Sequence, residues 1–190
     1  MIDDFARCIA AGGVAVFPAD TVYGLACDPE NAGAVERLYA LKGRPPAKPA
    51  AVMFFDKAQA LAGLPPRTHA LLDQLLPGGL TALLPNPERR FPLACGPDPG
   101  TLGIRLPDLP VLAGAPPVLQ SSANLAGGPE ARRLQDIPQA VRDGADLVLD
   151  GGELPGTPST VVDLRDYERA GAWTVVRLGA VPEQVIAAAA

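Results

Sequence analysis

Residues 14–27, VAVFPADTVYGLAC, decide the fold of this chain of 190 amino acids. The apolar run Val14–Phe17 predicts a short buried strand, and Tyr23–Cys27 predicts a second strand after the polar turn between them. In front of these strands, apolar residues recur at helical spacing over Ile2–Ala10, and the pair Gly12–Gly13 stops the helix. A helix followed at once by buried strands is typical of an α/β domain.

The rest of the chain continues this mixture of helices and strands. Helices are predicted over residues 34–41, 57–62, 68–76 and from 182 onward, and strands over 50–55, 80–84, 101–106, 117–120, 147–149, 160–164 and 173–178. Segment 85–100, which contains five Pro and two Gly, predicts an irregular excursion. No internal repeat and no long linker occurs, so we predict one α/β domain over residues 1–190 with an open, twisted, mixed sheet.

Composition excludes several classes of protein. Hydrophobic residues make up 48% and charged residues 19%, which excludes a largely disordered chain. No apolar run reaches the roughly 18–20 residues that span a bilayer, and the acidic start is unlike a secretory signal. Cys8, Cys27 and Cys95 lie far apart, which predicts a reduced, cytoplasmic protein without a disulfide framework or zinc cluster. The net charge of −5 disfavours binding nucleic acid over the whole surface but allows a local basic concavity.

The loop Lys42–Pro49 places three cations among three prolines. Proline reduces the entropy lost on ordering, so this loop can hold Lys42 and Arg44 against phosphate oxygens. A solvated basic loop without a ligand is the alternative interpretation. Neither a Walker loop nor a G-x-G-x-x-G fingerprint is present, so any nucleotide would be held by another design.

Polar groups also end or interrupt apolar strands. Segment Ser121–Asn124 follows a strand, where α/β sheets bind ligands, although a turn capped by its asparagine gives the same pattern. Arg105 lies inside an apolar strand and either reaches solvent or binds a carboxylate. Ser159 stands directly before another strand. The single histidine, His69, flanks the apolar face of a helix, so a serine–histidine hydrolase has no support.

Taken in order, seven segments resemble the YrdC-like family of threonylcarbamoyl-adenylate synthases. They are PADTVYGL (18–25), KGRP (42–45), PGGLT (77–81), GIRLP (103–107), SAN (122–124), STVVD (159–163) and RLG (177–179). The likeness covers almost the whole chain and is closest to the short, single-domain form. It implies an open α/β sheet around a deep, basic, concave cleft.

The resemblance also implies a reaction and its partners. The enzyme would be a nucleotidyltransferase that condenses L-threonine, bicarbonate and ATP to threonylcarbamoyl-AMP and diphosphate. Mg²⁺ would accompany ATP without a dedicated protein metal site. A downstream transferase complex would then carry the threonylcarbamoyl group to an adenosine beside the anticodon of tRNA, in the cytoplasm and away from any membrane.

Site residues follow from the same resemblance. Lys42 and Arg44 would be the catalytic contacts to the ATP phosphates. L-threonine would be bound by Thr21, Arg105, Ser122 and Ser159, and the rest of ATP by Thr101, Asn124, Arg132 and Arg177. Because the amine of threonine and the carbamate it forms act as nucleophiles, catalysis would come from positioning and charge stabilisation.

Two residues depart from the family pattern. Ala19 stands where the family usually has Thr, and Ala19→Thr is expected to tighten threonine binding, unless Thr21 or a reshaped pocket already compensates. Gly79 replaces a usual Pro and is expected to affect local rigidity more than chemistry.

Two other functions stay open at this point. A non-catalytic RNA-binding module of the same fold is disfavoured by the acidic balance and by the 5% aromatic content. A related carbamoyl-transfer enzyme of hydrogenase maturation would carry zinc-finger-like cysteine motifs, and this chain has none.

Overall fold

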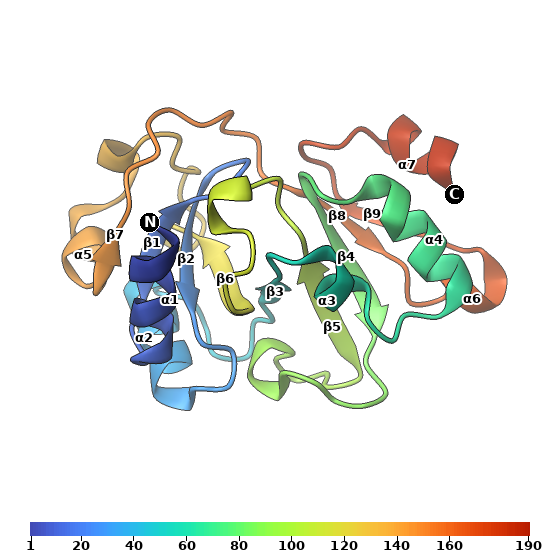
Figure 1. Ribbon diagram of the computed structural model, residues 1–190, viewed down its shortest axis with the longest axis horizontal. Helices are drawn as coiled ribbons and strands as arrows, with labels where there is room; N and C mark the ends of the chain where they lie inside the picture. The colour runs from blue at the N-terminus through green and yellow to red at the C-terminus, as the bar shows by residue number, and fades with distance from the viewer.

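Nine strands form one mixed sheet in the computed structural model, which describes residues 1–190 (Figure 1). The strands lie in the order β7-β1-β2-β6-β3-β5-β4-β8-β9. Pairs β1–β7, β3–β5 and β4–β8 are parallel, and the other five pairs are antiparallel. Strand bounds are β1 Ala15–Pro18, β2 Tyr23–Cys27, β3 Ala51–Met53, β4 Leu80–Pro85, β5 Thr101–Arg105, β6 Val118–Ser122, β7 Leu147–Val148, β8 Thr160–Asp163 and β9 Thr174–Arg177. The predicted mixed sheet is therefore confirmed.

Seven α-helices and three short 3₁₀ segments cover this sheet. The α-helices are α1 Ile2–Ala10, α2 Ala32–Lys42, α3 Lys57–Leu61, α4 Pro66–Leu75, α5 Gln139–Asp143, α6 Tyr167–Ala170 and α7 Glu183–Ala189. The 3₁₀ segments are Pro92–Ala94, Pro110–Leu112 and Leu134–Asp136. None of these helices combines the length and the apolar content needed to cross a bilayer.

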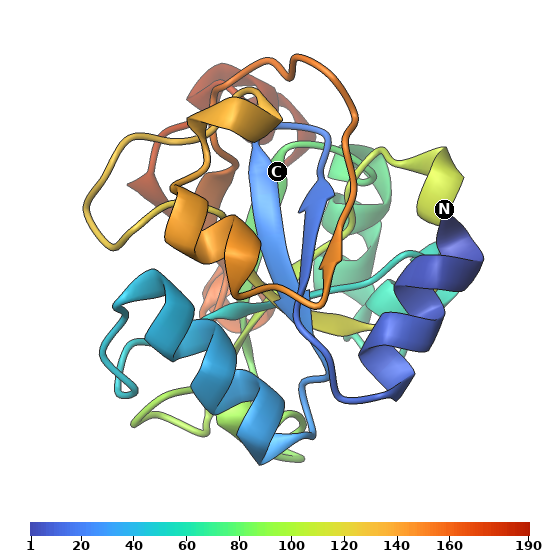
Figure 2. The same ribbon diagram turned by 90° about the vertical axis from the view of Figure 1, so that its left-hand side faces the viewer.

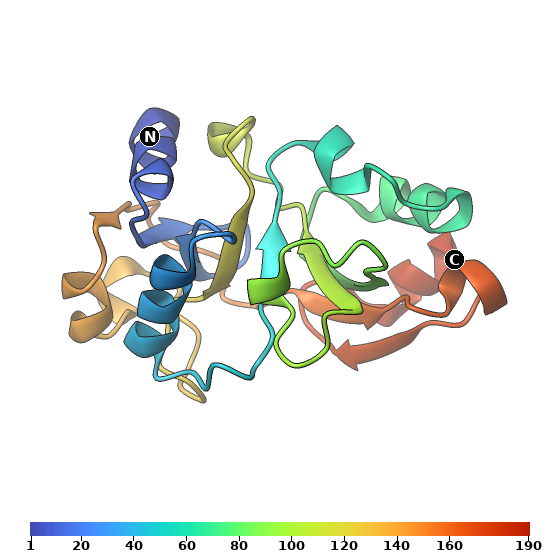
Figure 3. The same ribbon diagram turned by 90° about the horizontal axis from the view of Figure 1, so that it is seen from below.

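The β1–β2 hairpin separates two apolar clusters because successive side chains on a strand point to opposite faces. Val14 and Val16 belong to the larger cluster, whereas Ala15 and Phe17 belong to the smaller one. Helix α2 covers the first face and α1 covers the second, so the two helices lie on opposite sides of the hairpin (Figures 2 and 3). The sequence Val14–Phe17 thus fixes where both helices pack.

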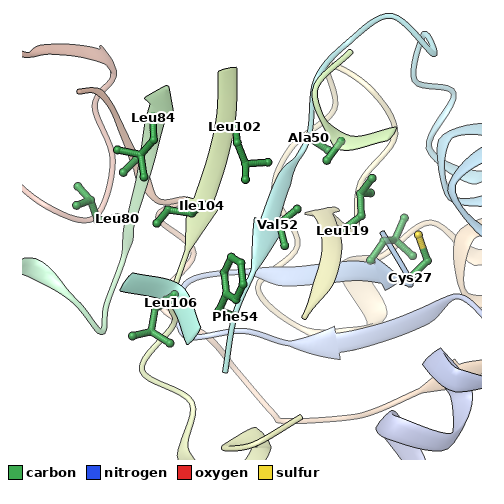
Figure 4. Close-up of a cluster of buried hydrophobic side chains, with 14 of the residues drawn as sticks. Cys27, Ala50, Val52, Phe54, Leu80, Leu84, Leu102, Ile104, Leu106 and Leu119 are labelled. Atoms are coloured by element: carbon green, nitrogen blue, oxygen red, sulfur yellow. The ribbon is translucent and has the colours of Figure 1, made fainter. Parts of the chain in front are cut away.

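The larger cluster contains 34 buried residues and runs along the middle of the sheet. Figure 4 follows it from Leu80 and Leu84 on β4 through Ile104 and Val52 to Cys27 on β2. Helix α4 contacts both α6 and α7 at the end of the molecule that holds the C-terminus, opposite the N-terminus (Figure 1). This continuous core makes the sheet a rigid base for a site on its other face.

Two helices were not predicted from the sequence. Helices α5 and α6 contain five and four residues with only two apolar residues each, which is too few for a 3.6-residue period to be visible. The predicted irregular excursion 85–100 holds only one 3₁₀ turn between β4 and β5. The other predicted elements occur with ends that differ by at most two residues, and the strand expected over 50–55 shortens to β3.

Candidate functional site

A cleft of about 560 Å³ is lined by the strand faces that point away from the larger core cluster. On β5, Leu102 and Ile104 enter that core, while Thr101, Gly103 and Arg105 line the cleft. The same alternation acts along β4, where Thr81 and Leu83 line the cleft, because side chains on a strand have a period of two. Seven charged residues line the cleft, namely Arg44, Lys48, Arg105, Arg165, Arg177, Asp98 and Glu130.

Small residues keep this face of the sheet open. Gly24 on β2, Ala51 on β3 and Gly103 on β5 line the cleft, and Ala51 lies opposite Gly103 in the sheet. A Cβ atom on Gly24 would come within 2.8 Å of the Phe17 ring, so the β1–β2 hairpin accepts no side chain there. Glycine inside a strand often marks a place where a ligand approaches the backbone closely.

Arg105 is the most buried cation of the cleft, with 3% of its surface exposed. Its guanidinium forms an ion pair with Asp20 and donates to the Thr21 hydroxyl at 2.7 Å, while Nε has no partner. Burial lowers the pKa of Arg105 and the carboxylate of Asp20 raises it, yet a guanidinium stays charged at neutral pH. A buried charged fork whose Nε has no partner suits a carboxylate ligand.

Ser159 and Arg177 meet beside Arg105 at the same end of the cleft. The Ser159 hydroxyl lies 2.9 Å from the Thr81 hydroxyl, and Arg177 donates to the Ser159 carbonyl at 2.8 Å. The cleft lining includes Thr81, Arg105, Ser159 and Arg177. Ser159 and Arg177, expected on the threonine and ATP sides respectively, are therefore direct neighbours.

Lys42 is buried under the cleft and does not line it. The last residue of α2, it is 4% exposed, and its Nζ donates to the Ser122 carbonyl at 2.6 Å, to the Ser122 hydroxyl at 3.1 Å, and to two oxygens of Asn124. Burial lowers the pKa of Lys42 to about 8. Asn124 is likewise buried behind Ser122, which alone of the three lines the cleft.

Arg44 lies on the cleft wall because Gly43 ends α2 in the left-handed region, at φ 60°. Its guanidinium donates to the carbonyls of Lys48 and Pro49 and lies 5.7 Å from the centre of the Tyr39 ring. The loop Lys42–Pro49 is thus closed on itself, and it presents Arg44 and Lys48 to the cleft.

Thr101 lies on the cleft wall, and Arg132 lies elsewhere. The Thr101 hydroxyl donates to Asp98 at 2.6 Å and lies 3.5 Å from a guanidinium nitrogen of Arg165. Arg132 instead forms an exposed ion pair with Glu153 at 3.0 Å and is absent from the cleft lining. The structure therefore brings Arg44, Thr101, Arg105, Ser122, Ser159 and Arg177 together around one space.

The two departures from the family pattern have steric explanations. Ala19 is 3% exposed and belongs to the apolar cluster of Phe5 and Phe17, so its methyl group is surrounded by hydrocarbon. The expectation that a threonine at this position would reach the ligand is not supported by that packing. A Cβ atom on Gly79 would lie 2.7 Å from Cβ of Ala180, so the absent side chain makes room for the segment after β9.

Sequence reasoning missed five charged residues of the site, one of which is Asp98, the acceptor of the Thr101 hydroxyl. Asp20 stands inside the quoted PADTVYGL motif, and its acidic side chain before a buried strand was the available signal. Lys48 belongs to the basic loop that was singled out. Arg165 and Glu130 come from turns with no motif of their own, and the Glu130 Oε2 atom is buried without a partner.

Comparison with known proteins gives consistent matches. The family model of Sua5, YciO and YrdC, described as "Telomere recombination", matches residues 7–179. A threonylcarbamoyl-AMP synthase of Chromohalobacter salexigens is 37% identical over 177 residues, which are 88% of this chain and 94% of the relative. E. coli YciO superposes with a TM-score of 0.82 at 27% identity, over 97% of this chain and 92% of that one.

A longer relative has been solved with a ligand. P. abyssi Sua5 complexed with L-threonine superposes with a TM-score of 0.87 at 28% identity. The match includes 99% of this chain but only 56% of the P. abyssi chain, so this protein spans little more than half of that relative.

Proposed function

The chain belongs to the family of Sua5, YciO and YrdC, and from this membership we propose that it is a threonylcarbamoyl-AMP synthase. The reaction joins L-threonine, bicarbonate and ATP and releases diphosphate, which makes the enzyme a nucleotidyltransferase. The proposal rests above all on Arg105. Its buried guanidinium lies on the wall of the cleft, and its Nε has no hydrogen-bond partner.

Threonine would bind at the Arg105 end of the cleft. Its carboxylate would meet the guanidinium, while Thr21 holds the far side of that group and Ser122 and Ser159 offer neutral contacts. The complex of P. abyssi Sua5 with L-threonine supports this ligand for the fold. Asp20 would orient Arg105 and keep its charge paired when the cleft is empty.

ATP would occupy the remaining space between the basic loop and β9. Arg44 and Lys48 face the cleft from the loop and Arg177 faces it from β9, so the anionic phosphates would lie between two cationic walls. Thr101 would contact the nucleoside part from the cleft wall. Asn124 and Arg132 do not line the cleft, so a direct role for either would need a rearrangement of its present hydrogen bonds.

The chemistry would need no nucleophile from the protein. The threonine amine adds to bicarbonate with loss of water, and an oxygen of the resulting carbamate attacks the α-phosphorus while diphosphate leaves. Cations that face the phosphates stabilise the charge that develops on the leaving group. The cleft holds the carbamate and the nucleotide in one orientation and so removes the entropic cost of their encounter.

Magnesium would enter with ATP. The chain has no group of three His, Cys, Asp or Glu residues that could hold a metal ion by itself. Glu130 fits the role of single protein contact, because it lines the cleft and its buried Oε2 lacks a partner. When bound, the ion would neutralise negative charge on the phosphates.

The product would leave for a separate transferase that modifies tRNA beside the anticodon. Its bond to AMP activates the threonylcarbamoyl group for such a transfer, in which AMP is the leaving group. We place the reaction in the cytoplasm, where thiols such as the free Cys8, Cys27 and Cys95 stay reduced.

Diphosphate release tests this proposal. The purified protein is incubated with ATP, Mg²⁺ and bicarbonate, and each amino acid is added in turn. We expect release that depends on both threonine and bicarbonate and that yields an adenylate detectable by mass spectrometry. Release without an amino acid, or with another amino acid preferred to threonine, would reject the proposed substrate.

A further inference from the structure

We propose that Lys42 is a positioning residue that binds no phosphate and instead fixes Ser122 and Asn124, so that the Ser122 hydroxyl faces the cleft only as a hydrogen-bond acceptor. This inference rests on the proposed function for the identity of the ligand, and it differs from the expectation that Lys42 contacts ATP.

The first argument is the use of the ammonium donors. Lys42 carries three N–H groups, and four oxygens of Ser122 and Asn124 surround its Nζ within hydrogen-bond distance. The side chain is 4% exposed and lies outside the cleft lining. A phosphate could reach this ammonium only if the contacts that satisfy it were broken.

Backbone contacts hold the same two segments together. The Lys42 carbonyl accepts from the Ala126 amide at 2.8 Å, so both the side chain and the main chain of the last residue of α2 are tied to the segment after β6. Lys42 therefore joins a rigid helix to the strand end on which Ser122 lies.

The second argument is the direction of the hydrogen bonds. Asn124 donates from Nδ2 to the Gly128 carbonyl at 2.6 Å, which leaves its Oδ1 as an acceptor. The Ser122 hydroxyl must then donate to this Oδ1, at 2.7 Å, and accept from Lys42. One lone pair of Ser122 remains for the cleft, because a hydroxyl has one hydrogen and two lone pairs.

This polarity selects the chemistry of the ligand group that Ser122 can bind. An acceptor suits an N–H or O–H and repels a carboxylate or phosphate oxygen. In the proposed reaction the matching group is the threonine nitrogen, which keeps an N–H as amine and as carbamate. Ser122 would thus orient the nitrogen while Arg105 binds the carboxylate.

The test compares Lys42→Met, Lys42→Arg, Ser122→Ala and the double variant Lys42→Met/Ser122→Ala with Arg44→Ala. The exposed Lys57, which pairs with Asp73 at 2.8 Å, supplies the control Lys57→Met. KM is measured for threonine and for ATP by diphosphate release, and ATP binding is measured by calorimetry. Urea unfolding of each protein reports whether it is folded.

We expect Lys42→Met and Ser122→Ala each to raise KM for threonine about ten-fold, and Lys42→Met to leave the Kd of ATP within about two-fold. The double variant should be no worse than the more impaired single variant, since both remove the same contact. Lys42→Arg keeps the charge but spreads its donors over a planar guanidinium instead of placing three of them on one nitrogen. It should therefore share the threonine defect. Lys57→Met should behave as wild type.

Other outcomes overturn the inference. If Lys42→Met weakened ATP binding as much as Arg44→Ala does, Lys42 would be a phosphate contact. The same conclusion would follow if the KM increases of Lys42→Met and Ser122→Ala multiplied in the double variant. If Lys42→Met does not fold, the ATP affinity of Lys42→Arg decides. Failure of the proposed function shows separately, as wild-type diphosphate release that ignores threonine. ATP calorimetry and the coupling of Lys42 to Ser122 in urea unfolding then still decide the role of Lys42.

Discussion

Arg105 joins two parts of the site, because one guanidinium contacts both Asp20 and Thr21 and still has a free Nε. Lysine would keep the charge but offers a single point where arginine offers a fork. We predict that Arg105→Lys raises KM for threonine at least ten-fold and changes KM for ATP by less than three-fold. Diphosphate release measured against each substrate gives this ratio. Equal changes in both constants would mean that Arg105 only supports the fold.

Ala19 carries the second residue-scale prediction, which reverses the expectation from the sequence. Ala19→Thr would place a hydroxyl among Phe5, Phe17 and their apolar neighbours, at a cost of about 1–3 kcal/mol. We predict lower stability in urea and no gain in threonine affinity. Valine has nearly the same shape as threonine but no hydroxyl. Comparing Ala19→Val with Ala19→Thr therefore separates the cost of crowding from the cost of burying the hydroxyl. Tighter threonine binding in Ala19→Thr alone would restore the original expectation.

At the scale of single residues, the sequence identified the side chains of the site better than their partners. Arg105, Ser122 and Ser159 were found because each interrupts or borders an apolar strand. The pairing of Arg105 with Asp20 could not be predicted, since it joins residues 85 positions apart that only the sheet brings together. The burial of Lys42 was not predictable for the same reason, because it depends on the distant end of β6.

Helix α2 gives the prediction at the scale of elements. Asn31 caps this helix, and its side-chain oxygen accepts from the Ala34 amide at 3.1 Å. Loss of such a cap costs about 1 kcal/mol, so Asn31→Ala should lower the free energy of unfolding by that amount, whereas Asn31→Ser should retain most of it. Urea unfolding measures both. Equal stability of the two variants would show that Asn31 stabilises the protein by contacts other than the cap.

Elements with a clear period or a run of apolar residues were predicted to within two residues. The β1–β2 hairpin and helices α2 and α4 belong to this group. The order of the strands was not predictable, because β6 inserts between β2 and β3 through pairings that no local pattern encodes. The cleft depends on that order, so its walls could be inferred only from the family resemblance.

The stability of the whole molecule should depend on pH through its buried thiol on β2. Burial raises the pKa of Cys27 to about 12 from an ordinary value of 9.0. Between these values the unfolded chain loses a proton that the folded chain keeps, so stability falls as pH rises through this window, by at most about 1.4 kcal/mol per unit. We predict that Cys27→Ala flattens this part of the urea unfolding profile.

Lys42 acts in the opposite direction. Its pKa is lowered to about 8 from 10.5, so between these values the unfolded chain holds the extra proton and stability rises with pH. Both wild type and Cys27→Ala contain Lys42, so the difference between their free energies of unfolding at each pH cancels its contribution and leaves that of the Cys27 thiol. An unchanged slope above pH 9 in Cys27→Ala would contradict the assigned cause.

The strand order has a consequence for how each molecule is made. Strand β4 pairs with β8, in which Thr81 lies opposite Val161, so the ribosome must add about 80 residues before β4 gains its second neighbour. Until then β4 has an open edge, and exposed edges of nascent chains favour aggregation. The site itself needs Ser159 and Arg177 and cannot exist before that stage. Ligands therefore cannot guide early folding, and we expect the growing chain to depend on chaperones until β8 and β9 emerge.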